Sequence, residues 1–534
     1  MNKVISIEKI TTNLIYLQVL EACQRAVCSL DALCWQSIIV RIMTNWRITI
    51  QDLLEHSPAR WLLFTRRRWL LVGALLLAMA VVGVGGGWLI AEVGALPVLA
   101  LLVGLGYVAW VLRDIEIAYL GVIGIIALLP FASVPFDLGF TPTFLDLTLL
   151  ALFAVWALPY ILGEEQRFVM TPVGGAVLAF MLMAIGAFVS GLSHGALTSY
   201  LVRHFAEVLL SIALFYLVVN TVRDVARLRS LMRWVVLGAT AAALLGIGLY
   251  FLPDELAIRI LSALGRFGYP TGSGVLWYIR DDPTLMQRAT STSVHPNVLG
   301  SLLNVALAMA APQLFARRPF LPRWLLLGAM GVMGLGLGLT VSRGSMLGLA
   351  VAVTVLAGLR YRKLLPLMGV GLLLFLVLPW TQGLVTHFVE GFLQEDLSTQ
   401  MRMGEYKDTF TLIARYPVLG VGFAGAPDID IYVAVASVYL LIAAQMGLVG
   451  LVTFLVIMGT VLARFWRRRV AVGCHPELEP LWYGIHAAII GGLVGGVFDH
   501  YFFSLDFHHS VTLFWLLVGL ATAATEMIGV RSEE

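Results

Sequence analysis

Long apolar runs that are almost free of charge follow one another along most of the chain, and they constrain the fold more than any other feature. Of the 534 residues, 60% are hydrophobic and only 13% are charged, and the mean hydropathy is +0.90. A soluble chain carries about 25% charged residues, so a soluble enzyme, a secreted disulfide scaffold and a disordered chain are excluded. The runs are too long for β-barrel strands, and a backbone in lipid must satisfy its own polar groups. The sequence therefore predicts an all-α, polytopic helical bundle.

A spanning helix needs about 20 mostly apolar residues. Such runs predict about 14 transmembrane helices, with about 12 as the lower bound. They lie near residues 69–90, 93–112, 116–133, 145–162, 171–192, 204–220, 234–252, 297–315, 324–341, 344–359, 364–380, 432–463, 482–498 and 510–527. Residues 1–60 hold three of the four cysteines and no such run, which predicts a cytosolic or interfacial segment before a membrane domain at 61–534.

The distribution of Lys and Arg predicts the orientation. Cytoplasmic loops carry an excess of these residues, and 26 of the 35 fall in inner segments if the N terminus is cytosolic. We therefore expect an inner (plasma) membrane protein with both termini in the cytosol. Two long outer loops, near 253–296 and 381–431, are then the expected place for chemistry outside the membrane, because long loops are usually functional.

Nine cations remain on the outer side, and eight of them are arginine. They are Arg203, Arg259, Arg266, Arg280, Arg288, Arg343, Arg402, Lys407 and Arg415. Guanidinium groups bind phosphate through paired hydrogen bonds and are desolvated more easily than ammonium groups. This preference indicates an anionic lipid-linked ligand, such as a diphosphate. The alternative, anchoring of helix ends at lipid headgroups, is favoured for Arg259, Arg266 and Arg280.

Local context distinguishes some of the other arginines. Arg203 and His204 lie where a short outer loop enters an apolar helix, a position that is costly for ionisable groups unless they face a cavity or a partner. Arg343 starts a helix after a two-residue break, where free N–H groups also suit an anion. A structural cap explains either residue equally well. Asp146, beside a Pro-containing outer turn, is expected to be solvated.

Several motifs in a fixed order carry a resemblance to a known family. They are Arg288-Ala-Thr-Ser-Thr-Ser-Val-His-Pro-Asn297, Ser342-Arg-Gly344, the amphipathic stretch 402–422 with the span start at 436–450, and Phe498-Asp-His-Tyr501. In this order they resemble the O-antigen ligase and polymerase superfamily over roughly residues 115–525.

The resemblance implies a metal-independent glycosyltransferase that works outside the membrane without a cofactor. Such enzymes move a glycan from undecaprenyl diphosphate to an acceptor glycan or glycolipid, and arginines matching Arg343 and Arg402 hold the donor diphosphate. Together with the phosphate argument, this predicts a donor site of Arg203, Arg288, Arg343, Arg402 and Arg415. Expected partners are the lipid-linked glycan, the acceptor, membrane lipids and polysaccharide-assembly proteins. Nucleic acid is not expected.

The chain departs from the family at one important position. Ligases carry a His, usually followed by Asn, as the candidate general base at the start of the helix after the large loop, whereas this chain has Ala436 and Ser437. Loss of a general base typically costs about 10²–10⁴-fold in rate. Asp499 and His500 are the preferred candidates for a replacement general base, because the Asp499 carboxylate could orient the His500 ring. His387, His508 and His509 lie on the same side of the membrane and are further candidates. The competing interpretation is a set of interfacial polar residues beside an aromatic belt.

Two other function classes stay open. A transporter or flippase of lipid-linked sugars predicts charges buried in mid-span and internal pseudo-symmetry. A non-catalytic scaffold in a polysaccharide-assembly complex would not need the missing His. The sequence has no P-loop, so ATP-driven transport has no support.

Overall fold

The computed structural model describes residues 68–94, 114–135, 141–163, 168–377, 397–425 and 435–530, with a few further residues at 98–111 and 382–386. The predicted N-terminal segment 1–60, most of the predicted span at 93–112, and His387 lie outside the described residues. The chain divides into two compact units, Met1–Val103 and Gly104–Glu534. The described part of the first unit contains α4 (Arg68–Val93), a helix of 26 residues at the predicted span 69–90.

The described part of the second unit is a helical bundle, as the sequence predicts. Its long helices are α6 (Ile115–Leu128), α7 (Phe144–Ile161), α8 (Pro172–Gly191), α9 (Ser199–Thr221), α10 (Val225–Phe251), α12 (Pro296–Ala310), α13 (Arg323–Thr340), α14 (Arg343–Leu359), α15 (Leu364–Val377), α18 (Val438–Arg468), α19 (Glu479–Gly495) and α20 (His508–Val530). Eight helical segments of the described residues are long and apolar enough to cross a membrane. The multi-pass, all-α class is thus confirmed, while the number of 14 spans stays a prediction.

Burial separates central helices from peripheral ones. Nearly every residue of α12 and α20 is buried, and α20 packs on α9 while α19 packs on α12 and α14. A helix that is apolar on all sides belongs in the interior. Peripheral helices expose large apolar side chains, such as Leu182 on α8 and Trp324 on α13. These outward faces suit contact with lipid.

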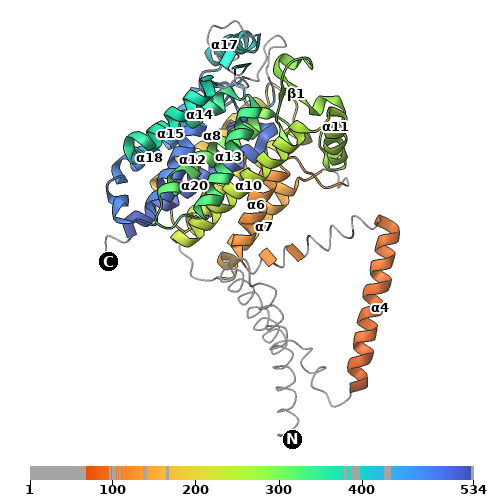
Figure 1. The fold of residues 1–534 in the computed structure, drawn as a ribbon. Coiled ribbons are helices and arrows are strands. Elements are labelled where there is room, and N and C mark those ends of the chain that lie inside the picture. Colours follow the sequence, from red (N-terminus) through yellow and green to blue (C-terminus); the bar gives the residue numbers. More distant parts are fainter. Residues whose placement is uncertain are drawn as a thin grey trace. The chain divides into compact units, whose positions relative to one another are not determined.

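The two predicted long loops contain secondary structure of their own. The first holds α11 (Asp254–Ser262), short 3₁₀ turns, and an antiparallel pair of two-residue strands, β1 (Trp277–Tyr278) and β2 (Gln287–Arg288). The second holds α17 (Leu397–Arg415), which covers the predicted amphipathic stretch. Figure 1 shows α17, β1 and α11 at one end of the bundle and the end of α20 at the other.

Helix α18 is broken within the predicted long span. Gly447 has φ 68° and ψ −178°, so it interrupts the helical hydrogen bonds. The chain after α17 inserts at this break: Leu448 N donates to Pro417 O (2.8 Å), Val421 N to Ala444 O (2.8 Å) and Gly422 N to Gln445 O (3.0 Å). Non-helical backbone at membrane depth is tolerated only where other protein groups satisfy it. This insertion supplies those groups.

The break predicts a strong effect of one glycine substitution. In Gly447→Ala the new Cβ would lie 2.1 Å from Val418 O, and the positive φ adds strain. Left-handed backbone alone costs roughly 1–2 kcal/mol for a residue with a Cβ, so we expect a clearly lower Tm in lipid nanodiscs. Gly459→Ala is the matched control, because it lies on the same helix with no atom within 4 Å of the added Cβ. Equal melting of the two variants would contradict the broken helix.

Candidate active site

Arg288 is a half-buried cation that no carboxylate contacts directly within the described part of the chain. Its Nε donates to Thr340 O at 2.9 Å, and its Nη2 donates to the side-chain oxygen of Asn297. Strand β2 is held in place because Ala289 N donates to Leu339 O (2.9 Å). Burial lowers the pKa of Arg288 to about 10, so the side chain is still charged at neutral pH. The protein therefore keeps an available positive charge at this end of the bundle.

Asn297 joins this arginine to Asp499. Its Nδ2 donates to Asp499 Oδ1 at 3.0 Å, while its Oδ1 accepts from Arg288. Asp499 lies in the turn after α19, and its backbone oxygen accepts from Val438 N at the start of α18 (3.1 Å). Burial raises the pKa of Asp499 to about 6, against the lowering effect of Arg402. The carboxylate is thus ionised at neutral pH and anchored by an amide.

His500 does not pair with Asp499 among the contacts of the described residues, in contrast to the arrangement expected from their adjacency. Its ring packs against Tyr501 and Phe507, with centroid distances of 4.8 and 6.2 Å. Its Nδ1 is buried and has no hydrogen-bond partner in the described part. Burial lowers the pKa of His500 to about 4, so the ring is neutral at pH 7.

Arg343 and Arg402 approach the same group from two other elements. Both lie close enough to lower the pKa of Arg288 by charge repulsion. Arg343 begins α14 after the predicted break, where Val341 adopts a left-handed conformation (φ 53°). The following Gly344 packs against Asp499, since an added Cβ would lie 3.3 Å from Oδ2. Arg288, Arg343 and Arg402 thus lie near one another on β2, α14 and α17, and Arg288 and Arg402 act on the half-buried carboxylate of Asp499. A gathering of positive charge of this kind suits an anion.

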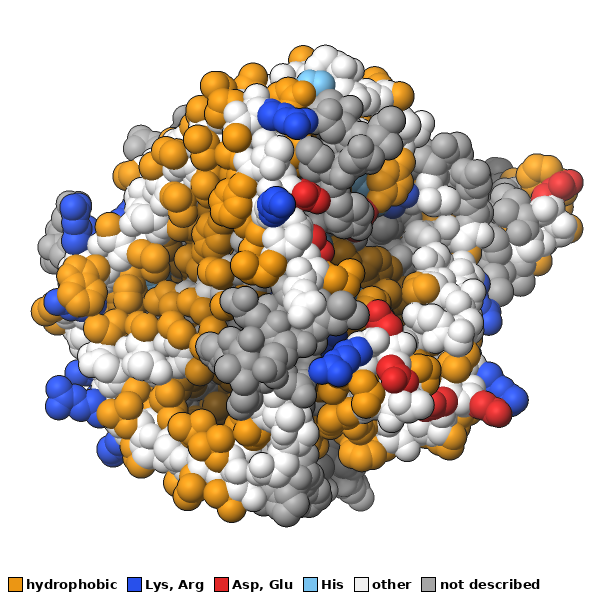
Figure 2. All heavy atoms as spheres, turned by 90° about the horizontal axis from the view of Figure 1, so that it is seen from above, with side chains coloured by type: hydrophobic (Ala, Val, Ile, Leu, Met, Phe, Trp, Pro, Cys, Tyr) orange, Lys and Arg blue, Asp and Glu red, His pale blue; other side chains and the backbone are white. Residues whose placement is uncertain are grey.

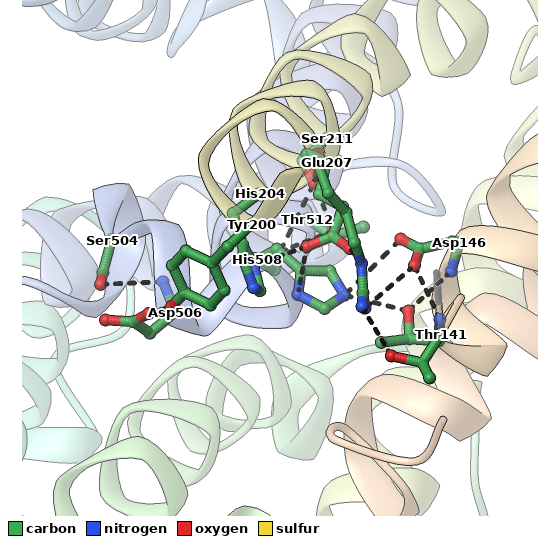
Figure 3. Close-up of polar contacts among 12 residues, drawn as sticks. Thr141, Asp146, Tyr200, His204, Glu207, Ser211, Ser504, Asp506, His508 and Thr512 are labelled. Atoms are coloured by element: carbon green, nitrogen blue, oxygen red, sulfur yellow. Dashed lines mark hydrogen bonds and ion pairs between the residues drawn. The ribbon is translucent and has the colours of Figure 1, made fainter. Parts of the chain in front are cut away.

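Arg203 belongs to a second polar cluster (Figure 3). Its Nε donates to Glu207 Oε1 (2.7 Å), its Nη1 donates to Thr141 Oγ1 (3.1 Å), and its Nη2 lies 3.8 Å from Asp146 Oδ2. Glu207 Oε2 lies 2.9 Å from His204 Nδ1. Two carboxylates thus offset the charge of Arg203, which ties α9 to α7.

Asp146 is not the solvated turn residue that the sequence suggests. Its side chain is 13% exposed and forms a capping box with Thr143, accepting from Thr143 N at 2.8 Å. Its Oδ1 lies 4.0 Å from His508 Nε2, and His508 Nδ1 lies 3.5 Å from Glu207 Oε2. The donor atoms of Asp146, Glu207 and His508 all lie within 4.8 Å of one another, close enough to share a cation. Arg203 already bridges both carboxylates and offsets part of their negative charge.

Arg415 lies at the end of α17. Thirteen residues separate it from Arg402, which is about 20 Å along a helix. The structure therefore brings together three of the five predicted donor-binding arginines, Arg288, Arg343 and Arg402, and leaves Arg203 and Arg415 apart from them.

Sequence reasoning did not identify Asn297 or Glu405 as site residues. Asn297 follows a Pro at a helix start, and only the fold shows that its amide joins Arg288 to Asp499. Glu405 Oε2 accepts from Ala436 N at 3.2 Å. This contact joins α17 to the residues before α18, and no sequence pattern indicates it.

Comparison with known families bears on this site. Residues 328–455 match the O-antigen ligase family. The matched segment includes Arg343, Arg402 and Ala436 and lies within the region of the predicted resemblance, which it supports. No curated protein matches the chain. The spanning helices indicate a multi-pass membrane protein, and the match shows that one segment of it is similar to the O-antigen ligase family.

The second cluster yields a prediction about stability. Arg203→Gln would leave the carboxylates of Glu207 and Asp146 without their guanidinium partner. Removing one partner of a buried ion pair costs about 3–5 kcal/mol, so we expect a marked fall in Tm. Adding Glu207→Gln should recover part of that loss, because one unpaired charge disappears. A double-mutant cycle on thermal unfolding in nanodiscs measures the coupling, and strict additivity would show that the two side chains do not interact.

Proposed function

We propose that this chain is a membrane glycosyltransferase that transfers a glycan from undecaprenyl diphosphate to an acceptor sugar. One observation carries the proposal: Arg288, Arg343 and Arg402 come from three elements, Arg343 and Arg402 lie close enough to act on the charge of Arg288, and Arg288 and Arg402 also act on Asp499. Two of the three arginines lie in the segment that matches the O-antigen ligase family. A diphosphate is the ligand whose charge and hydrogen-bond acceptors suit this group.

The transfer would proceed as one displacement at the anomeric carbon. The acceptor oxygen forms a bond to that carbon as the carbon's bond to the diphosphate oxygen breaks, which inverts the configuration. Negative charge grows on the leaving diphosphate, and fixed cations placed against it stabilise the transition state. The three arginines supply that charge from side chains, consistent with a reaction that needs no metal.

A general base must take the proton of the acceptor hydroxyl. Asp499 and His500, the two residues proposed from the sequence, are both unprotonated at neutral pH because their pKa values are about 6 and about 4. Asp499 is held by Asn297, and the Nδ1 of His500 is buried. Their positions favour a role in shaping the arginine group over direct contact with an incoming sugar.

The proposal places the site on the extracytoplasmic face of the inner membrane, with cytosolic termini. Acceptor glycans, membrane lipids and polysaccharide-assembly proteins are the partners that this location supplies. A transporter or flippase would bind the lipid-linked glycan without releasing undecaprenyl diphosphate, and a scaffold would leave glycan synthesis intact when the arginines are changed.

The arginine group predicts which substitutions abolish transfer. Purified protein in nanodiscs is given an undecaprenyl-diphosphate oligosaccharide, and released undecaprenyl diphosphate and product glycans are measured by mass spectrometry. Arg343→Ala and Arg402→Ala should each lower the rate by about 10²–10³-fold, the usual effect of removing one group that stabilises developing charge. Arg415→Ala, at the other end of α17, should keep its rate.

The products separate the remaining possibilities. Longer lipid-linked chains would indicate a polymerase, and release only with an added acceptor would indicate a ligase. Unchanged rates in both Arg343→Ala and Arg402→Ala would refute the donor site. No release by folded protein that still binds the donor would favour transport or scaffolding instead.

A further inference from the structure

Helix α17 is fastened to the chain just before α18 through a single peptide unit. Glu405 Oε2 accepts from Ala436 N at 3.2 Å, and Tyr406 Oη donates to Ala436 O at 3.4 Å. Two neighbouring side chains of α17 therefore hold the N–H and the C=O of the same residue. This fixes the position of the Glu405 carboxylate relative to the helix that follows.

Glu405 also lies one helical turn after Arg402. Residues three apart on a helix are neighbours on its surface, and the charge of Arg402 acts on the carboxylate. Glu405 is half-buried and forms no ion pair among the described residues. Its second oxygen, Oε1, has no hydrogen-bond partner in the part of the chain that the structure describes. A carboxylate with one oxygen anchored and one available therefore stands beside a proposed diphosphate ligand.

Access distinguishes Glu405 from the deeper carboxylate. Asp499 lines a cavity of only about 10 Å³ together with Ser345 and Tyr501, room for about one water molecule and none for a sugar. The outward face of α17 borders a hollow of about 590 Å³, lined by Met403, Tyr406, Lys407, Phe410, Thr411 and Ala414. Glu405 lies on the opposite face, next to Arg402 and the buried Thr409. Figure 2, seen from the end where α17 lies, shows charged side chains of both signs around a hollowed surface. Glu405 is itself only half-buried, so part of its side chain remains open to a glycan hydroxyl.

We propose that Glu405 is the general base that activates the acceptor hydroxyl, a step that rests on the proposed function. The carboxylate removes the hydroxyl proton as the acceptor oxygen bonds to the anomeric carbon of the donor glycan. The bond between that carbon and the diphosphate oxygen breaks, and undecaprenyl diphosphate leaves with the electron pair. The proton then passes from Glu405 to water. The proton, the bond that forms, the bond that breaks and the electron pair of the leaving group are thus all assigned.

The groups around Glu405 determine at which pH it becomes protonated, and hence how the transfer rate changes with pH. Burial raises its pKa, while the Ala436 N–H and the Arg402 charge lower it. Among the described residues, Arg402, Asp499 and Glu405 all act on Tyr406, so these titratable groups share one environment. Lys407 and Asp408 follow on the same helix. An acid with a raised pKa loses its base form at a higher pH than usual. Transfer by the wild-type protein should therefore fall as the pH drops towards a pKa above 4.5.

The test uses the full chain in nanodiscs and two separate measurements, donor binding and glycan transfer. Glu405→Gln should lower the transfer rate by about 10²–10⁴-fold, leave binding of the undecaprenyl-diphosphate oligosaccharide unchanged, and abolish the acid limb of the pH profile. Glu405→Ala should regain transfer when formate is added, because formate supplies a free carboxylate. A purely structural role would not respond to formate. Asp408→Asn, one turn further along α17, is the matched control and should behave as wild type.

The outcomes separate this inference from the proposed function. Full transfer and an unchanged pH profile in Glu405→Gln, with Arg343→Ala inactive, would overturn the role of Glu405 and keep the donor site. In that event, loss of the acid limb in Asp499→Asn or His500→Gln would identify the base. Full transfer in every variant would refute the proposed function itself. If Glu405→Gln does not fold, Glu405→Asp keeps the test open: it should retain part of the rate and the pH limb.

Discussion

The hydrogen-bonded series from Arg288 through Asn297 to Asp499 is the interaction on which the candidate site depends. A direct Arg–Asp pair would neutralise both charges, whereas an amide between them holds both side chains and leaves each charge in place. Asn297 can do this because it has an acceptor and a donor at one end of a short side chain. It also connects β2, α12 and the turn after α19 in one contact.

The two arginine clusters show how partners decide what an arginine can do. Arg203 pairs with the carboxylates of Asp146 and Glu207, so its charge is offset within the fold. These ion pairs join α7 to α9. Arg288 is half-buried as well but contacts a carbonyl and an amide, which are polar without carrying charge. Burying a cation without a direct counter-ion costs free energy. The surroundings of Arg288 therefore leave a positive charge available at this end of the bundle, which suits an anionic ligand.

Much of the fold could be predicted because its signals are local. A run of about 20 apolar residues indicates a membrane helix without reference to the rest of the chain, and helices lie at the predicted spans in the described residues. Outer arginines stand out because the positive-inside bias makes them exceptional. This bias singled out nine outer cations, which include Arg288, Arg343 and Arg402 but also Arg203 and Arg415, which lie apart from them.

The remaining features depend on contacts between distant segments. The i,i+4 spacing of Arg203 and Glu207 is a local signal for their pairing, but nothing near Asp146 indicates that α9 and α20 pack over it. The contact between Glu405 and Ala436 likewise exists only because α17 folds back on the start of α18. A polar residue beside a turn looks the same in sequence whether water or a second helix covers it.

The break in α18 explains how these distant segments meet in one place. Gly447 separates a short first half of the helix from the long span, so the two halves can take different directions. Val438, at the start of the first half, donates from its N–H to Gly496 O (2.8 Å) and Asp499 O (3.1 Å), while Glu405 and Tyr406 hold Ala436 just before it. The half-helix is therefore fixed by the turn that carries Asp499 and by the helix that carries Arg402. Reacting groups in an active site must be held about 3–3.5 Å apart. Under the proposed function, a short segment anchored by hydrogen bonds on both sides would supply that rigidity.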